Sequence, residues 1–151
     1  MGKKLSAKLG YEFKDMDHLI EENEGMSISD IFREKGEKKF REMEQETLTK
    51  LISGENIVIS TGGGVPCQPG NMDLINMHGI SIYLRMETED LFERLKARKA
   101  RRPLIKDLSD AELKDFIIEN LADRESYYNQ AKYIVDGSKR DVVEILGLIM
   151  H

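Results

Sequence analysis

The sequence predicts an α/β fold with a mostly parallel sheet, and two observations lead to this fold class. Short runs rich in β-branched residues, at 56–61, 80–84 and 133–136, alternate with segments whose apolar residues recur at helical spacing. The length of 151 residues is that of one domain, which we expect to span residues 1–151.

The first third of the chain predicts three helices and one short strand. We expect helices at 3–9, 28–35 and 37–52 and a strand at 11–13. Gly10 suits the end of the first helix. Ser27 and Asp30 resemble a cap at the start of the second, and Gly36 separates it from the third.

The rest of the chain predicts strands that alternate with helices. We expect strands at 56–61, 80–84 and 133–136, and helices at 72–77, from Thr88 onward, from Ser109 onward and at 141–150. Thr88 can cap the helix that follows it. The run at 56–61 is apolar enough for a buried parallel strand. Ser109 and Glu112 form a capping box that opens a long helix with a buried stripe through Leu113 and Ile117.

The composition excludes several classes of protein. The 23 basic and 28 acidic residues give a net charge of −5, which argues against a general nucleic-acid or anionic-membrane binder. No apolar run approaches the roughly 18 residues that span a bilayer, and residues 1–6 lack the apolar segment of a signal peptide. Cys67 is the only cysteine, so an internal disulfide is excluded. We expect a cytoplasmic protein.

Two aspartates, Asp15 and Asp17, alternate at the end of the first predicted strand. Such carboxylates can divide two tasks, because one can hold a hydrated Mg²⁺ ion while the other accepts a hydrogen bond from a substrate hydroxyl. The alternative is a turn with two solvated aspartates, since aspartate is common in turns.

Three consecutive glycines, Gly62, Gly63 and Gly64, directly follow the strand predicted at 56–61. Because no side chain stands in the way, their N–H groups can approach an anion or a bound ring. Open α/β sheets bind ligands at the carboxyl ends of their strands. A binding loop and a flexible turn are therefore about equally supported.

Arg41 follows the apolar Phe40 and lies three residues before Glu44. This spacing places Arg41 at the border of the buried helix face, where Glu44 can hold its guanidinium. An oriented arginine can grip a substrate carboxylate with two parallel hydrogen bonds. The alternative is an ion pair on the surface.

A basic stretch runs from Arg94 to Arg102 and ends at Pro103. It can form a mobile lid over phosphates, a nucleic-acid contact or a solvated helix end. The acidic remainder of the chain disfavours nucleic acid. Arg124 lies off the apolar stripe of its helix and can be a plain exposed arginine. Cys67 has no histidine near it in sequence, so we interpret it as a bystander thiol.

The order of these motifs is more specific than any one of them. From Gly2 to about Arg140 the chain resembles the shikimate kinase family, through Leu9-Gly10-Tyr11-x-Phe13-x-Asp15-x-Asp17, Gly25-Met26-Ser27-Ile28, Phe40-Arg41-x-x-Glu44, Ser60-Thr61-Gly62-Gly63-Gly64, Arg102-Pro103-Leu104 and Arg124-x-x-x-Tyr128-x-x-x-Ala131. The resemblance implies a three-layer fold like that of nucleoside monophosphate kinases, with a parallel sheet flanked by helices. It also implies ATP-dependent phosphorylation of the shikimate 3-hydroxyl, in aromatic amino-acid biosynthesis.

The resemblance implies a role for each candidate residue. Asp17 would hold the attacking hydroxyl and take its proton, and Arg102 would reach the transferring phosphoryl group with a lid at about 98–109. The substrate would be bound by Asp17, Arg41, Glu44, Gly62, Gly63, Gly64 and Arg124, and the nucleotide by Arg98, Arg102 and Arg140. Asp15 would reach Mg²⁺, which accompanies ATP, through water. We expect a monomer whose partners are shikimate and ATP, with no nucleic acid and no membrane.

One motif of the family is absent from these 151 residues. It is the phosphate-binding loop G-x-x-G-x-G-K-[ST], together with the strand before it, which by resemblance is central and lies between 56–61 and 80–84. Its absence would leave two strand edges unpaired, unless those strands pair with each other. We therefore expect impaired phosphotransfer, because the loop holds the nucleotide phosphates.

The missing loop has three possible origins. We expect the natural chain to begin upstream. The alternatives are a true truncation and a second subunit that supplies the loop. The alternative function is that of a non-catalytic shikimate-binding or regulatory remnant.

Overall fold

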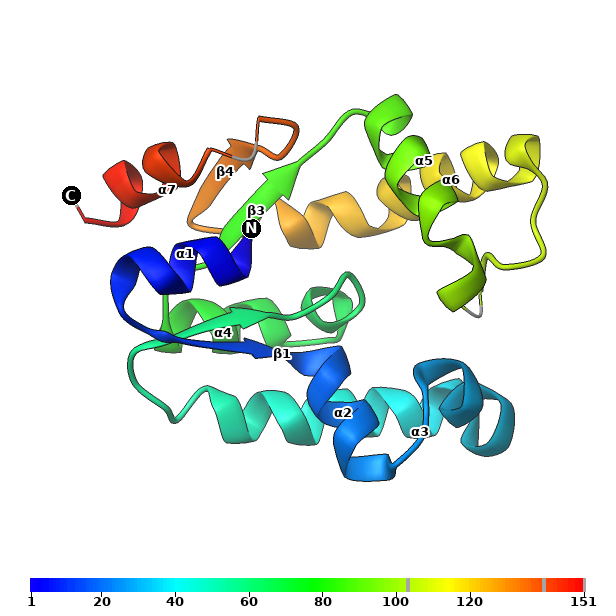
Figure 1. The fold of residues 1–151 in the computed structure, drawn as a ribbon, viewed down its shortest axis with the longest axis horizontal. Helices are drawn as coiled ribbons and strands as arrows, with labels where there is room; N and C mark the ends of the chain where they lie inside the picture. The colour runs from blue at the N-terminus through cyan, green and yellow to red at the C-terminus, as the bar shows by residue number, and fades with distance from the viewer. Residues whose placement is uncertain (103, 140, 151) are drawn as a thin grey trace.

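The computed structural model describes residues 1–102, 104–139 and 141–150 and confirms the α/β fold class (Figure 1). The elements in chain order are α1 (Gly2–Leu9), β1 (Glu12–Asp15), α2 (Met16–Glu24), α3 (Ile28–Leu51), β2 (Ile57–Ser60), the short 3-10 helix η1 (Val65–Cys67), α4 (Asn71–His78), β3 (Ile82–Arg85), α5 (Thr88–Ala97), the short 3-10 helix η2 (Lys99–Arg101), α6 (Asp110–Tyr128), β4 (Tyr133–Asp136) and α7 (Val142–Ile149).

The strands form two separate parallel pairs. β1 pairs with β2 and places Asp15 opposite Ser60, whereas β3 pairs with β4. Parallel pairing was predicted and is confirmed. The prediction that 56–61 is a buried strand is wrong, because Ile57, Val58 and Ile59 are only half-buried in a strand that pairs along one edge. In the described part of the chain β2 and β3 do not pair with each other.

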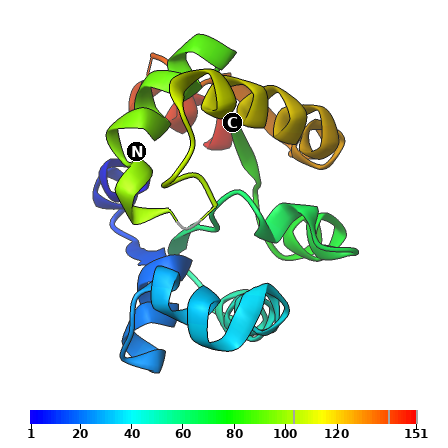
Figure 2. The ribbon, with the colours of Figure 1, turned by 90° about the vertical axis from the view of Figure 1, so that its right-hand side faces the viewer.

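The two strand pairs divide the molecule into two halves. The first half contains β1, β2, α2, α3 and α4, and the second contains β3, β4, α5, α6 and α7. In the turned view, α2 and α3 lie below and α5 and α6 lie above (Figure 2). Leu5 of α1 is buried with Val135 and Ile145 of the second half, and Val58 of β2 packs against the same cluster. The helix α1 therefore joins the halves.

Two helix starts follow the predicted capping chemistry. The Ser27 hydroxyl accepts a hydrogen bond of 3.1 Å from the Asp30 N–H. Ser109 and Glu112 make the predicted reciprocal capping box. The predicted stripe of α6 is also confirmed, because Leu113 is fully buried against α5.

Two local predictions were wrong. Thr88 does not cap α5: the cap residue is Glu87, and Thr88 is the first helical residue. The helix α2 was missed, because Asp15 was interpreted as part of a strand end. Its side chain accepts hydrogen bonds from the N–H groups of Asp17 and His18, and so it starts a helix.

The segment predicted as a lid, 98–109, is attached to the core through Ile105 and Leu108. Ile105 is 2% exposed and packs with Phe92 of α5 and Leu113 of α6. Pro103 lies outside the described residues. No helix within the ranges that the structure describes has both the length and the apolar character that crossing a bilayer requires.

Candidate active site

Three of the predicted substrate residues meet around the glycine segment, Gly62–Gly64, that follows β2. A Cβ atom added to the first glycine would lie 3.8 Å from Oδ1 of Asp17. One added to the second would lie 3.3 Å from Nη1 of Arg124, and one added to the third 2.9 Å from Cζ of Arg41. Side chains from α2, α3 and α6 therefore converge on one short segment.

The glycine segment needs glycine for steric and conformational reasons. A side chain on Gly64 would collide with the Arg41 guanidinium. Gly62 has a φ of +75°, which side chains disfavour. Among the described residues, no N–H group of Gly62, Gly63 or Gly64 finds a hydrogen-bond acceptor. These donors are available to a ligand.

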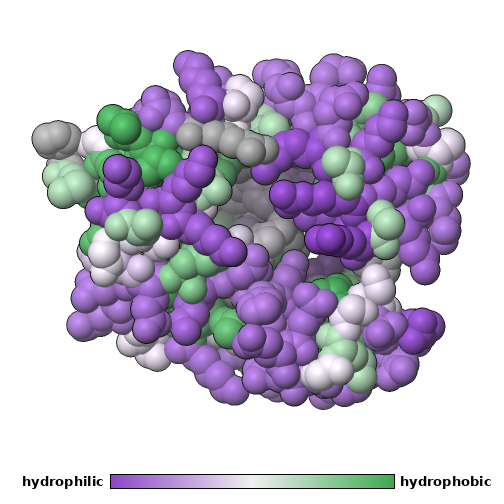
Figure 3. Space-filling model, viewed as in Figure 1, coloured by the Kyte–Doolittle hydropathy of each residue, from purple (hydrophilic) through white to green (hydrophobic). Residues whose placement is uncertain are grey.

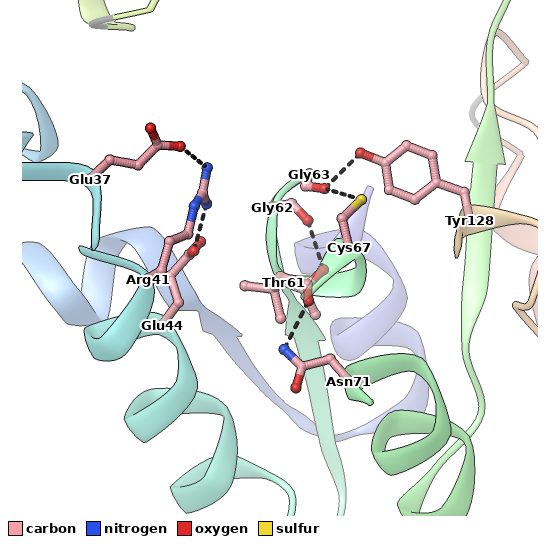
Figure 4. Close-up of polar contacts among 10 residues, drawn as sticks. Glu37, Arg41, Glu44, Thr61, Gly62, Gly63, Cys67, Asn71 and Tyr128 are labelled. Carbon is pink, nitrogen blue, oxygen red and sulfur yellow. Dashed lines mark hydrogen bonds and ion pairs between the residues drawn. The ribbon is translucent and has the colours of Figure 1, made fainter. Parts of the chain in front are cut away.

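Arg41 is held by two carboxylates, as Figure 4 shows. Its Nη1 lies 2.6 Å from Oε1 of Glu44, and its Nη2 lies 3.4 Å from Oε1 of Glu37. The predicted Arg41–Glu44 pair is therefore confirmed, and it is not a surface pair, since the two side chains are 20% and 4% exposed. Burial alone would lower the pKa of Arg41, but Glu44 and Glu37 outweigh burial and raise it.

The pKa of Glu44 is raised although a guanidinium lies beside it. Burial is the largest cause, and the Asp17 carboxylate adds to it, while Arg41 and Arg124 act in the opposite direction. Arg41 therefore favours the charged form of Glu44, whereas burial disfavours it.

Asp17 presents its carboxylate in the first turn of α2. Burial raises its pKa, and so do the charges of Asp15 and Glu21. Arg102 and Arg41 act against this rise, so both lie close enough to interact with it electrostatically. A raised pKa makes Asp17 a stronger base than an ordinary aspartate.

Asp15 differs from Asp17 in that its side chain caps the helix α2. Its Oδ1 accepts hydrogen bonds of 3.0 Å from the Asp17 N–H and 3.3 Å from the His18 N–H. The interpretation of Asp15 and Asp17 as two solvated aspartates in a turn is wrong, because one caps α2 and the other is half-buried.

Arg124 differs from Arg41 in its partners. Within the described ranges no carboxylate oxygen lies within 4 Å of its guanidinium, so its charge is not paired. Arg98 is the exposed C-cap of α5 and is not brought to the glycine segment by any contact found among the described residues. Arg140 lies outside the described residues.

Four contributing residues were not predicted as part of the site. The Tyr128 hydroxyl donates a hydrogen bond of 2.6 Å to the Gly63 carbonyl, and the Cys67 thiol approaches the same oxygen at 3.6 Å. The other two are Glu37, which pairs with Arg41, and Asn71. The buried side-chain amide of Asn71 donates a hydrogen bond of 2.9 Å to the Val65 carbonyl. Only Tyr128 had a usable signal, since it lies one helical turn after Arg124.

Figure 3 shows a hollow near the centre of one face, bordered by hydrophilic side chains. Across the described residues, no cluster of three His, Cys, Asp or Glu side chains could enclose a metal ion. A cation here would need ligands beyond the protein side chains.

Fold and site together define an α/β enzyme whose site suits a small hydroxylated acid, because a carboxylate with a raised pKa and two guanidinium groups meet at one glycine segment. Comparison with known proteins gives the particular family. Residues 1–150 match the profile of the family described as shikimate kinase. The chain therefore belongs to the shikimate kinase family and is a phosphotransferase of aromatic amino-acid biosynthesis.

Individual relatives agree with this family. The chain is 47% identical over 151 residues to a shikimate kinase from Azobacteroides pseudotrichonymphae, a match that covers 99% of this chain and 89% of the relative. A shikimate kinase structure from Bacteroides thetaiotaomicron has a TM-score of 0.92 at 37% identity and covers 99% of this chain and 90% of its own. One from Acinetobacter baumannii in complex with shikimate has a TM-score of 0.89 at 32% identity, with 99% and 84% covered.

Proposed function

We propose that this protein transfers the γ-phosphoryl group of ATP to the 3-hydroxyl of shikimate, with Asp17, Arg41 and Arg124 as the groups that hold the substrate. The observation that carries this proposal is the convergence of these three side chains on Gly62–Gly64. A related structure solved with shikimate supports the choice of substrate.

Arg124 is the main partner of the substrate carboxylate in this proposal. Its guanidinium has no carboxylate within 4 Å in the described part of the chain, whereas Arg41 is already paired with Glu44 and Glu37. Bidentate pairing of a guanidinium with a carboxylate is both strong and directional. Arg41 completes the clamp, because it lies beside Gly64 while Arg124 lies beside Gly63, and the N–H groups of this segment are free to bind the substrate as well.

Asp17 orients the attacking hydroxyl and accepts its proton. Phosphoryl transfer depends mainly on positioning and on neutralisation of charge. The raised pKa of Asp17 suits proton acceptance. Arg102, which interacts with Asp17 electrostatically, stabilises the charge on the transferring group from the lid side.

The residues present fit a Mg²⁺ ion that binds together with ATP and keeps most of its water ligands. Asp15 uses Oδ1 to cap α2, which leaves its second oxygen for a water ligand of the ion. Mg²⁺ keeps several waters in sites that also hold substrate phosphates. The ion would neutralise phosphate charge there.

The nucleotide is also contacted, in this proposal, by residues of the lid and of the segment before α7. Arg98 and Arg140 are the candidates from the resemblance. An open cavity of about 700 Å³ is lined by three lysines and one aspartate, Lys4, Lys8, Lys139 and Asp141, beside Arg140 in sequence. The cations outnumber the single carboxylate, which suits an anionic ligand. We also propose that the protein works as a monomer in the cytoplasm.

The test compares the 151-residue chain with a form that carries the family's strand and G-x-x-G-x-G-K-[ST] loop before residue 1. A coupled assay of ADP release should show transfer to shikimate by the longer form and little or none by the 151 residues. Calorimetry should show shikimate binding to both. Failure of both forms to bind shikimate would refute the proposed substrate, and shikimate binding without transfer by either form would favour a non-catalytic binding protein.

A further inference from the structure

The carbonyl oxygen of Gly63 is held from two directions. Tyr128 of α6 donates its hydroxyl at 2.6 Å, and Cys67 of η1 approaches with its thiol at 3.6 Å. The tyrosine bond is the shorter and stronger of the two. It also joins the two halves of the molecule, because Gly63 follows β2 and Tyr128 ends a helix that packs in the second half.

Tyr128 is itself firmly placed. Its ring lies against that of Tyr83 of β3, with centroids 5.1 Å apart. The next residue, Asn129, accepts a hydrogen bond of 2.9 Å from Arg85, also of β3. Burial raises the pKa of Tyr128 to about 12, so the phenol keeps its proton at neutral pH and remains a donor.

The orientation of the Gly63 carbonyl fixes the orientation of a neighbouring donor. This oxygen and the N–H of Gly64 belong to one planar trans peptide unit, in which they point in opposite directions. Figure 4 shows Tyr128 and Arg41 on opposite sides of the glycine segment. A carbonyl directed toward Tyr128 therefore directs the Gly64 N–H away from α6 and toward the side of Arg41.

We propose that Tyr128 is a positioning residue that fixes the Gly62–Gly64 segment against α6, and thereby sets both the direction of the Gly64 N–H and the spacing of Arg41 and Arg124 for the substrate carboxylate. The inference rests on the proposed function for the identity of the ligand. It assigns a role in substrate binding to a residue that does not itself contact the substrate. Arg124 precedes Tyr128 by one helical turn, so the hydroxyl that fixes the glycine segment also fixes its distance from that guanidinium.

The first test measures shikimate affinity by calorimetry in Tyr128→Phe. This variant keeps the ring contact with Tyr83 and loses only the hydroxyl. We expect the dissociation constant to rise by about threefold to tenfold, the usual range for one hydrogen bond. The matched control is Tyr127→Phe, because the Tyr127 hydroxyl has no hydrogen-bond partner among the described residues. Equal affinity of Tyr128→Phe and the control would overturn the proposal.

The second test needs no ligand, so it separates this proposal from the proposed function. Backbone order parameters from ¹⁵N relaxation should fall at Gly62, Gly63 and Gly64 in Tyr128→Phe, because the segment loses its attachment to α6, while the order parameters of α7 stay unchanged. A uniform fall would indicate a merely structural role, and unchanged glycine order parameters would overturn the inference. If the wild-type protein fails to bind shikimate, the proposed function fails while the order parameters still decide the role of Tyr128.

Discussion

The half-buried carboxylate of Asp17 lowers the stability of the fold at neutral pH. Its carboxylate is half-buried, and burial together with Asp15 and Glu21 raises its pKa above the ordinary value. The folded state therefore binds this proton more tightly than the unfolded state does. The contribution of Asp17 to folding is favourable below the ordinary carboxyl pKa and is lost as the pH rises through the raised value.

Replacement of Asp17 by asparagine should separate activity from stability. We expect Asp17→Asn to unfold at a higher urea concentration than the wild type at pH 7, with a smaller difference near pH 4, because the variant removes a charge that is partly desolvated. In the form that carries the phosphate-binding loop, kcat should fall by about 100-fold or more. Loss of stability at pH 7, or kcat within a few-fold of the wild type, would contradict this assignment.

The activity of the longer form should also depend on pH through Asp17. Because the carboxylate must be ionised to accept a proton, kcat/KM should fall on the acid side at a pH above the ordinary aspartate pKa of about 3.9. Asp17→Asn should lack this acid limb in its residual activity. An acid limb that persists in the variant would point to another group as the base.

Arg41 gives a second prediction about stability. Arg41→Gln removes the guanidinium that lies 2.6 Å from Glu44, and Glu44 is 4% exposed, so its carboxylate would stay buried without that cation. We expect the free energy of unfolding to fall by about 3 kcal/mol, as when one partner of a buried pair is removed. Lys39→Gln, at an exposed position of the same helix, should change it by no more than about 0.5 kcal/mol. Equal effects in urea unfolding would show that the pair does not hold the helix.

At the scale of elements, the kink of α3 determines where Arg41 lies. Gly36 has φ +82° and ψ 166°, a conformation that is nearly restricted to glycine, and it separates the turns capped by Ser27 from those that carry Arg41. The sequence predicted two helices with a break at Gly36, and the structure agrees in its dihedral angles although the segment is continuous by hydrogen bonding.

The same substitution should have opposite effects at two glycines. Gly36→Ala should lower the free energy of unfolding by about 1–3 kcal/mol, since it strains the kink. Gly147→Ala in α7 should raise it by about 0.5–1 kcal/mol, because Gly147 is helical and an added Cβ has open space around it. Thermal or urea unfolding of the two variants checks both signs, and stabilisation by Gly36→Ala would refute the argument from the kink.

Local chemistry explains which elements could be predicted. The caps at Ser27 and Ser109 and the glycine at position 10 end or start helices through bonds to nearby residues, and a sequence shows such bonds directly. The helix α2 was missed because Asp15 ends a strand and caps a helix at the same time. Because Asp15 has both roles, the sequence pattern of the strand end was recognised and that of the helix start was not.

At the scale of the whole molecule, long-range contacts mark the limit of sequence reasoning. Residue types and order indicated Asp17, Arg41 and Arg124, and the structure brings them to one segment. The Tyr128 bond to Gly63 joins residues 65 positions apart, and no local pattern specifies it. The low burial of β2 was also not predictable from its apolar composition, because burial depends on how many neighbouring strands cover it.

The role of Arg124 is tested by comparing shikimate with its methyl ester, which lacks the carboxylate charge, by calorimetry on the wild type and on Arg124→Gln. The wild type should bind shikimate at least about tenfold more tightly than the ester, Arg124→Gln should lose this preference, and the exposed control Arg33→Gln should keep it. A preference for shikimate that survives in Arg124→Gln would show that Arg124 does not hold the carboxylate.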